Sequence, residues 1–148
     1  MFKKFLAKIF NLSQYEFEEV HVHDDVIESI LEYCKESDPN EFMALFDGEI
    51  TNKILTITGL IFLPIESSNE GVIIFSGMLP PTIKNWGSVH SHPGPNNSPS
   101  HSDLISFAKA GIFHMIISQP YEIENIMTYN RYGDTINYKI VKHYLNEY

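Results

Sequence analysis

The sequence predicts an α/β domain in which one β-sheet has two helices packed against it. Two stretches show the apolar spacing of helices, and several short apolar runs bounded by turn residues have the character of strands. The chain has 148 residues, and 43% of them are hydrophobic. That length is most simply one domain and is enough to bury about two-thirds of the unfolded surface. The strand order cannot be read from these patterns.

We expect residues 1–14 to form an N-terminal amphipathic arm and residues 15–148 to form the domain. In MFKKFLAKIF, apolar residues fall at helical spacing with three lysines between them. An arm packed on the domain or on a second copy of the chain is one interpretation, and docking to a membrane surface or a partner is the other. A homodimer is therefore possible. A signal peptide is not expected, because the apolar run is interrupted and no small-residue cleavage site follows.

The first half of the domain begins with a possible strand at 15–22, followed by the clearest helix, at 24–37. Apolar residues recur there at i, i+3 and i+4, acids stand at the start, and Pro39 prevents continuation. Two strands at 41–46 and 53–63 then read as a hairpin that turns at Asp47-Gly48.

The second half reads as two strands, a helix and three strands. The ranges are strands 72–76 and 85–92, a helix at 101–110 and strands 113–119, 125–130 and 135–141. Gly111 is positioned to end the helix. A turn at Arg131 to Asp134 links the last two strands.

Charge and cysteine content exclude several classes of protein. The net charge of −9 argues against general nucleic-acid binding, which needs a basic face. Cys34 is the only cysteine, so an intrachain disulfide and a thiolate zinc cluster are excluded, and a reducing, cytoplasmic setting is favoured. No run of 18 apolar residues is present, so we expect no stable membrane insertion.

The stretch SVHSHPGPNNSPSHSD, residues 88–103, has the residue types of a metal site. On a strand, His90 and His92 point to one face, and Pro93 suits a chain that leaves the strand there. Asp103 falls in the first turn of the next helix, from where it can face the two histidines. Two imidazoles and one carboxylate leave a fourth tetrahedral position open, as in catalytic zinc sites.

Each of these residues also has an ordinary structural interpretation. The histidines could pair in a solvated loop, and Asp103 could be an acid favoured by the helix dipole. Ser100 is well placed as the helix N-cap, with Asp103 as an imperfect capping box. His21 and His23 form a second H-x-H, which we interpret as exposed strand-end and capping residues. His101 could line the site.

The pattern His90-Ser91-His92-Pro93, six residues, Ser100-His101-Ser102-Asp103 resembles the H-x-H-P-x6-S-x-x-D signature of the JAMM (MPN-plus) zinc metalloproteases, in a minimal prokaryotic or archaeal form. In that family a glutamate on an earlier strand, in E-x-x-G-L-L-x-G, completes the site. Here the stretch Glu41 to Gly48 is similar, with Ala44 and Phe46 in place of the usual glycine and leucine. Glu36 and Glu49 compete less well, since only Glu41 opens an apolar, strand-like run.

The resemblance implies a fold, a cofactor and roles for residues. The fold would be JAMM/MPN-like (cytidine-deaminase-like), with a curved mixed sheet flanked by helices. His90, His92 and Asp103 would hold one zinc ion per chain. Glu41 would take a proton from the attacking water, and Ser100 would hydrogen-bond the oxyanion.

It also implies a substrate. The expected reaction is hydrolysis of the amide or isopeptide bond after the C-terminal glycine of a ubiquitin-like or sulfur-carrier protein, whose tail would lie as a strand along a sheet edge. A processing peptidase that trims a sulfur-carrier C-terminus and a non-catalytic MPN scaffold are the alternatives.

Overall fold

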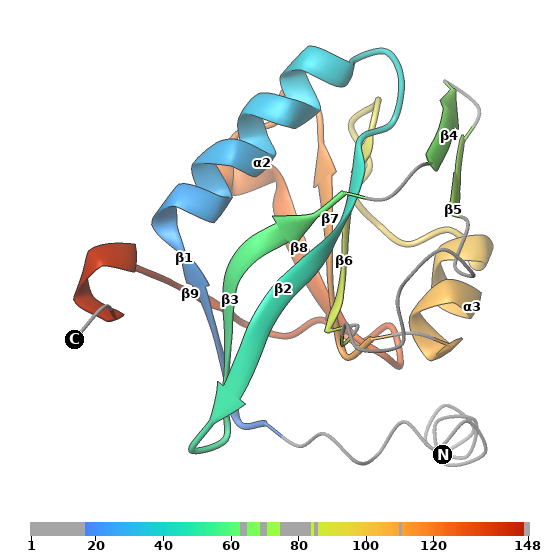
Figure 1. The fold of residues 1–148 in the computed structure, drawn as a ribbon. Coiled ribbons are helices and arrows are strands. Elements are labelled where there is room, and N and C mark those ends of the chain that lie inside the picture. The colour runs from blue at the N-terminus through green and yellow to red at the C-terminus, as the bar shows by residue number, and fades with distance from the viewer. Residues whose placement is uncertain are drawn as a thin grey trace.

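The computed structural model describes residues 17–62, 65–68, 71–74, 84, 86–109 and 111–146. Its centre is a seven-stranded sheet in the order β8-β7-β6-β2-β3-β1-β9, accompanied by a separate two-stranded sheet, β4-β5 (Figure 1). The strands are β1 (Glu19–His23), β2 (Met43–Thr51), β3 (Ile54–Ile61), β4 (Ile65–Ser68), β5 (Gly71–Ile74), β6 (Gly87–His92), β7 (Phe113–Ser118), β8 (Ile126–Asn130) and β9 (Lys139–Val141). The helices are α2 (Asp24–Ser37), α3 (His101–Lys109) and the short 3₁₀ helices η2 (Ile123–Asn125) and η3 (His143–Asn146).

The large sheet is mixed, as predicted. β1 runs parallel to both of its neighbours, β3 and β9, and β6 runs parallel to β7. The pairs β2–β3, β2–β6 and β7–β8 are antiparallel. β6 therefore lies inside the sheet with partners on both sides, which holds its backbone, and the direction of its side chains, firmly.

The two longer helices cover opposite faces of this sheet, as the alternation along β7 demonstrates. Phe113, Met115 and Ile117 belong to the main core, together with the buried face of α2. Ile116, between them, packs instead with Phe107 of α3 and with Tyr129 of β8. Because successive side chains of a strand point to opposite faces, α2 covers one face and α3 the other.

α2 has the bounds that the sequence predicts. Val26, Ile27, Ile30 and Cys34 are buried on one side, and Asp24 and Asp25 occupy the first turn, where the helix dipole favours negative charge. α3 also agrees with its prediction, and Gly111 follows it with a φ of +82°, a backbone conformation that favours glycine.

The predicted hairpin turn at Asp47-Gly48 is wrong. β2 runs through both residues, and the register with β3 shifts between them, which marks a β-bulge. A Cβ on Gly48 would overlap the backbone carbonyl of Thr56, so the partner strand requires glycine there. The turn lies at Asn52 and Lys53, whose φ values of 53° and 64° are those of a two-residue hairpin loop.

Other strand boundaries differ more modestly. β1 begins at Glu19 rather than at residue 15, and β4 has no counterpart among the predicted strands. The turn after β8 is present, since the Asn130 N–H donates to the Asp134 carbonyl. β9, however, does not pair with β8. The chain crosses to the far edge of the sheet, where β9 pairs with β1.

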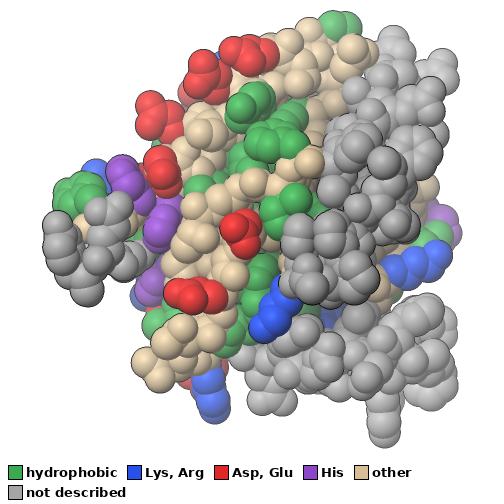
Figure 2. Space-filling model, in the orientation of Figure 1, with side chains coloured by type: hydrophobic (Ala, Val, Ile, Leu, Met, Phe, Trp, Pro, Cys, Tyr) green, Lys and Arg blue, Asp and Glu red, His purple; other side chains and the backbone are tan. Residues whose placement is uncertain are grey.

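Acidic side chains lie along the face of the molecule that Figure 2 shows. In Figure 2, Asp and Glu side chains follow α2 and the β2–β3 hairpin, with hydrophobic side chains exposed between them. Two exposed aromatic residues, Tyr33 and Phe62, contact each other edge to face. No helix in the described ranges is both long and apolar enough to cross a membrane. The predicted arm, residues 1–14, lies outside the described residues.

Candidate metal centre

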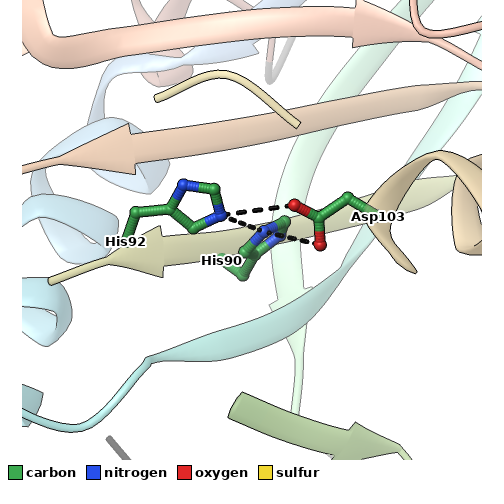
Figure 3. A group of neighbouring side chains, drawn as sticks. All are labelled: His90, His92 and Asp103. Atoms are coloured by element: carbon green, nitrogen blue, oxygen red, sulfur yellow. Dashed lines mark hydrogen bonds and ion pairs between the residues drawn. The ribbon is translucent and has the colours of Figure 1, made fainter. Parts of the chain in front are cut away.

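β6 presents two histidines on the face of the sheet that α3 covers. Val89 belongs to the core under α2, and Ser91 accepts a hydrogen bond from the Phe42 N–H at 2.8 Å. His90 and His92 alternate with these residues and therefore point to the opposite face, as predicted from the i, i+2 spacing. Figure 3 shows both rings directed at the carboxylate of Asp103, which comes from the start of α3.

The loop after β6 returns the chain to the two histidines. The Gly94 N–H donates to the His92 carbonyl at 2.8 Å, and the Gln119 N–H donates to the Gly94 carbonyl at 2.9 Å. Ser100 then caps α3: the Asp103 N–H donates to Ser100 Oγ at 3.1 Å, and the Ser100 N–H donates to Asp103 Oδ2 at 2.9 Å. This reciprocal capping box fixes Asp103 in the first turn of the helix.

The three predicted ligand residues lie within contact of one another. His90 Nε2 is 3.1 Å from His92 Nε2, His90 Nε2 is 3.3 Å from Asp103 Oδ1, and His92 Nε2 is 3.3 Å from Asp103 Oδ2. A tetrahedral zinc ion with bonds of about 2.0–2.1 Å separates its ligand atoms by about 3.3 Å. The donor set and its spacing therefore fit zinc.

The backbone fixes the tautomer of His92. Its Nδ1 lies 2.9 Å from the carbonyl oxygen of Asn96, and a carbonyl can only accept, so Nδ1 carries the hydrogen. In the neutral ring, Nε2 then has a free lone pair that points at Asp103 and His90. A backbone carbonyl that orients a histidine in this way is the usual outer partner of a metal ligand.

The electrostatics of the cluster follow from its burial and its charges. Burial opposes ionisation of Asp103, but hydrogen bonds from His90 and His92 outweigh it and hold the pKa of the carboxyl well below its usual range. Burial also disfavours a charged His92, yet the bond to Asp103 and the Asn96 carbonyl raise its pKa overall. The site thus holds a carboxylate in its anionic form, as a metal ligand must be.

Glu41 stands beside this cluster, two residues before β2 begins rather than on the strand itself. The neighbouring Phe42 is buried in the core under α2, and its carbonyl accepts a hydrogen bond from the Ser91 N–H, which places this segment alongside β6. Burial raises the pKa of Glu41, and the histidines and Asp103 are close enough to act on it. A half-buried carboxyl with a raised pKa next to the cluster is suited to proton transfer.

Ser100 fulfils the capping role described above, and its side chain is exposed. Its Oγ accepts from the Asp103 N–H, so the hydroxyl hydrogen stays available to donate. Capping and hydrogen bonding to a substrate oxygen are therefore compatible. His101, the neighbouring residue, is exposed on α3.

Sequence reasoning missed two buried residues near the cluster. Tyr129 of β8 donates its hydroxyl to the Asn97 carbonyl in the loop at 2.8 Å. His114 of β7 lies 2.9 Å through Nδ1 from Ser88 Oγ, and its ring stacks on Phe107 of α3 at 4.1 Å. Both residues occur in strand-like apolar runs, where the sequence pattern indicates only a core position.

The second H-x-H does not form a comparable site. His21 Nε2 pairs with Glu19 at 3.0 Å near the end of β1. His23 stands at the N-cap position of α2 but makes no side-chain cap hydrogen bond, and it is buried, so the prediction of an exposed capping residue is wrong for His23. Asp24, Asp25 and His143 do lie together at the start of α2. Asp24 Oδ1 already accepts from the backbone N–H groups of Asp25 and His143 and lies 2.8 Å from His143 Nδ1. This cluster tethers η3 to the start of α2.

Known proteins share this architecture. A protein of Haloferax volcanii described as "Probable metalloprotease" is 28% identical over 124 residues, which are 79% of this chain and 76% of that protein. The structure described as "JAMM: A Metalloprotease-like Zinc Site in the Proteasome and Signalosome" is 31% identical, with a TM-score of 0.64, and the match covers 84% of this chain and 100% of that one. A JAB1/MPN domain protein from Archaeoglobus fulgidus is 33% identical, with a TM-score of 0.63 and coverage of 82% and 99%.

A protein from Desulfitobacterium hafniense has the same fold at 16% identity, with a TM-score of 0.52 over 83% of this chain and 93% of that one. The predicted JAMM/MPN-like α+β fold is thereby confirmed. The family model for prokaryotic homologs of the JAB domain matches residues 23–132. This range includes all five predicted site residues: Glu41, His90, His92, Ser100 and Asp103. The chain therefore belongs to the family of prokaryotic homologs of the JAB domain.

Proposed function

We propose that this protein is a zinc-dependent peptidase that hydrolyses the amide or isopeptide bond after the C-terminal glycine of a ubiquitin-like modifier. The observation that carries the proposal is the triangle of donor atoms from His90, His92 and Asp103, with edges of 3.1, 3.3 and 3.3 Å. Three protein donors leave one tetrahedral position for a water or a substrate, the arrangement of a catalytic zinc site. The relatives described as a probable metalloprotease and as having a metalloprotease-like zinc site support the same conclusion.

The residues around the triangle supply the remaining chemistry. Zinc held there would polarise the scissile carbonyl and lower the pKa of a water molecule. Glu41 takes a proton from the attacking water as its oxygen bonds to the carbonyl carbon. The same carboxyl then gives that proton to the amine as the C–N bond breaks. Ser100 donates its free hydroxyl hydrogen to the oxygen that becomes negative in the transition state.

The substrate class rests on the resemblance and on one property of the fold. Among the described strands, β4 and β5 pair only with each other, so each has an outer edge. An extended C-terminal tail ending in glycine can add to such an edge as a further strand. A linear fusion and a lysine-linked conjugate of the same modifier distinguish the processing reaction from isopeptide hydrolysis.

The test is zinc content by elemental analysis, on protein purified without chelator and without a histidine tag. We expect about one zinc per chain in the parent, held by His90, His92 and Asp103, and little in His92→Ala. His101→Ala is the matched control, because it removes an exposed histidine from the same segment and should keep its zinc. A parent that takes up no zinc, even after the metal is restored, would contradict the proposal.

A further inference from the structure

We propose that Tyr129 is a positioning residue for the metal-binding loop, a role that rests on the proposed function of His90, His92 and Asp103. Tyr129 lies on β8, opposite His114 of β7, so its side chain points to the face that α3 covers. Only 5% of its surface is exposed. Its hydroxyl donates to the Asn97 carbonyl at 2.8 Å.

The contact reaches His92 through one peptide unit of the loop. Asn97 directly follows Asn96, whose carbonyl accepts the hydrogen bond from His92 Nδ1 at 2.9 Å. On the other side, the Asn97 side chain donates Nδ2–H to the Asn125 carbonyl at 3.1 Å. At Asn97, the residue next to the acceptor that orients His92, the loop is therefore tied to β8 by its backbone and to η2 by its side chain.

The ring of Tyr129 reaches the third donor residue by another path. It stacks on Phe107 with 6.1 Å between ring centroids and 29° between ring planes. Phe107 lies four residues after Asp103 on α3, on the same side of the helix, and is 1% exposed. Tyr129 thus contacts both segments that must converge on the metal: the loop that orients His92 and the helix that carries Asp103.

This arrangement has an energetic consequence for metal binding. If the hydroxyl is lost, the Asn97 carbonyl loses its donor, and the loop gains freedom that zinc binding must then remove. The expected cost is about 10-fold in zinc affinity, the low end of the range for outer partners of metal ligands. Tyr129→Phe isolates the hydroxyl, because it keeps the ring and its packing on Phe107.

The matched control is Tyr121→Phe. Tyr121 is 4% exposed and also donates its hydroxyl, to Asp38 Oδ2 at 2.6 Å, but it belongs to the core under α2. This variant loses a buried phenol hydrogen bond on the opposite face of the sheet, so it reports the general cost of such a loss. A hydrogen bond to a charged acceptor contributes more than one to a carbonyl, so the control should lose at least as much stability.

The experiment measures zinc affinity by competition with a chelating dye, together with the visible absorption of the cobalt-substituted protein and the free energy of unfolding without metal. We expect Tyr129→Phe to bind zinc about 10-fold more weakly and to shift the cobalt spectrum, with Tyr121→Phe unchanged in both. Equal affinity in all three proteins, or equal losses in both variants, would overturn the inference.

Two further results keep the outcome interpretable. If the parent binds no zinc, the proposed function fails, whereas zinc-binding in the parent with an unchanged Tyr129→Phe variant overturns only the role of Tyr129. Should Tyr129→Phe not fold, Asn97→Ala carries the test, because it releases the same loop from Asn125. Unchanged zinc affinity in Asn97→Ala would then show that anchoring the loop at residue 97 does not support zinc binding, which would overturn the inference.

Discussion

Ser100 and Asp103 each donate a backbone N–H to the side chain of the other, and the Asp103 oxygen that accepts, Oδ2, also lies 3.3 Å from His92 Nε2. One carboxylate oxygen therefore belongs to a helix cap and to the candidate metal centre at the same time. The first turn of α3 cannot loosen without moving a predicted metal ligand. This coupling makes Ser100 more than a local stabiliser of the helix.

Ser100→Ala should affect stability and catalysis to different extents. Loss of the N-cap is expected to cost about 1 kcal/mol in the free energy of unfolding. Loss of the donor to the developing oxyanion is expected to lower kcat by about 10²–10³-fold. Chemical denaturation and steady-state kinetics on the same preparation measure the two effects. Ser100→Thr keeps both the cap and the hydroxyl, so it should recover most of the stability and most of kcat. If Ser100→Ala lowers stability but not kcat, Ser100 acts only as a helix cap.

Glu41→Gln should separate metal binding from hydrolysis. The amide cannot take a proton from water, so we expect kcat to fall by about 10²–10⁴-fold. Zinc content should stay at the parent level, because Glu41 is not one of the three converging donor residues. Glu49→Gln is the control, since Glu49 is exposed on β2 and should keep full activity. Retained turnover in the Glu41 variant would require another general base.

The parts of the fold that local patterns determine were predictable. α2 was found with its bounds because its apolar spacing, its first-turn acids and Pro39 all act within one segment. The order of the strands could not be predicted, because pairs such as β1 with β9 join residues more than a hundred positions apart. The Asp47-Gly48 pair misled for a similar reason: glycine suits a hairpin turn and a bulge equally well, and only the position of Thr56 on the partner strand decides between them.

The candidate site also contains residues that the sequence pattern predicts and one that it does not. His90, His92 and Asp103 could be predicted because their spacing and residue types carry the chemistry. Tyr129 could not, because a tyrosine in an alternating strand indicates a core position whether or not its hydroxyl reaches a functional loop. The partner that gives it a role, Asn97, is distant in sequence and is brought close only by the crossing from β6 through α3 to β8.

The corrected hairpin leads to opposite expectations for two substitutions. Lys53 has a φ of 64°, which costs a non-glycine residue about 1–2 kcal/mol, so Lys53→Gly should stabilise the chain by about 0.5–1 kcal/mol after the entropy of glycine is subtracted. The exposed ion pair that it loses with Glu18 contributes little. Gly48→Ala should destabilise by more than about 1 kcal/mol, because the new Cβ overlaps the Thr56 carbonyl.

Urea denaturation measures both effects. Gly59→Ala is the control in the same hairpin, since a Cβ there meets only the Asp47 side chain at 3.8 Å, which is ordinary contact. A stable Gly48→Ala variant would contradict the close approach of Gly48 to Thr56, and a destabilised Lys53→Gly variant would contradict the turn at Asn52 and Lys53.

His114 should make the stability of the metal-free protein depend on pH. Burial, reinforced by the nearby His90, lowers the pKa of His114 from 6.5 to about 3. Between these values the unfolded chain binds a proton that the folded chain does not, so the free energy of unfolding rises with pH across this window. Above about pH 6.5, His114 is neutral in both states and leaves the free energy of unfolding at its full value. As the pH falls from there toward 3, the free energy of unfolding decreases by up to about 1.4 kcal/mol per pH unit.

Chemical denaturation in the presence of a chelator, at a series of pH values between 4 and 7, measures this slope. His114→Gln removes the titrating ring while keeping a polar partner for Ser88, which His114 contacts at 2.9 Å. We expect a smaller slope in the variant, even though its absolute stability is lower because the stacking on Phe107 is lost. Equal slopes in the two proteins would contradict the prediction, because they would mean that His114 is protonated as readily in the folded chain as in the unfolded one.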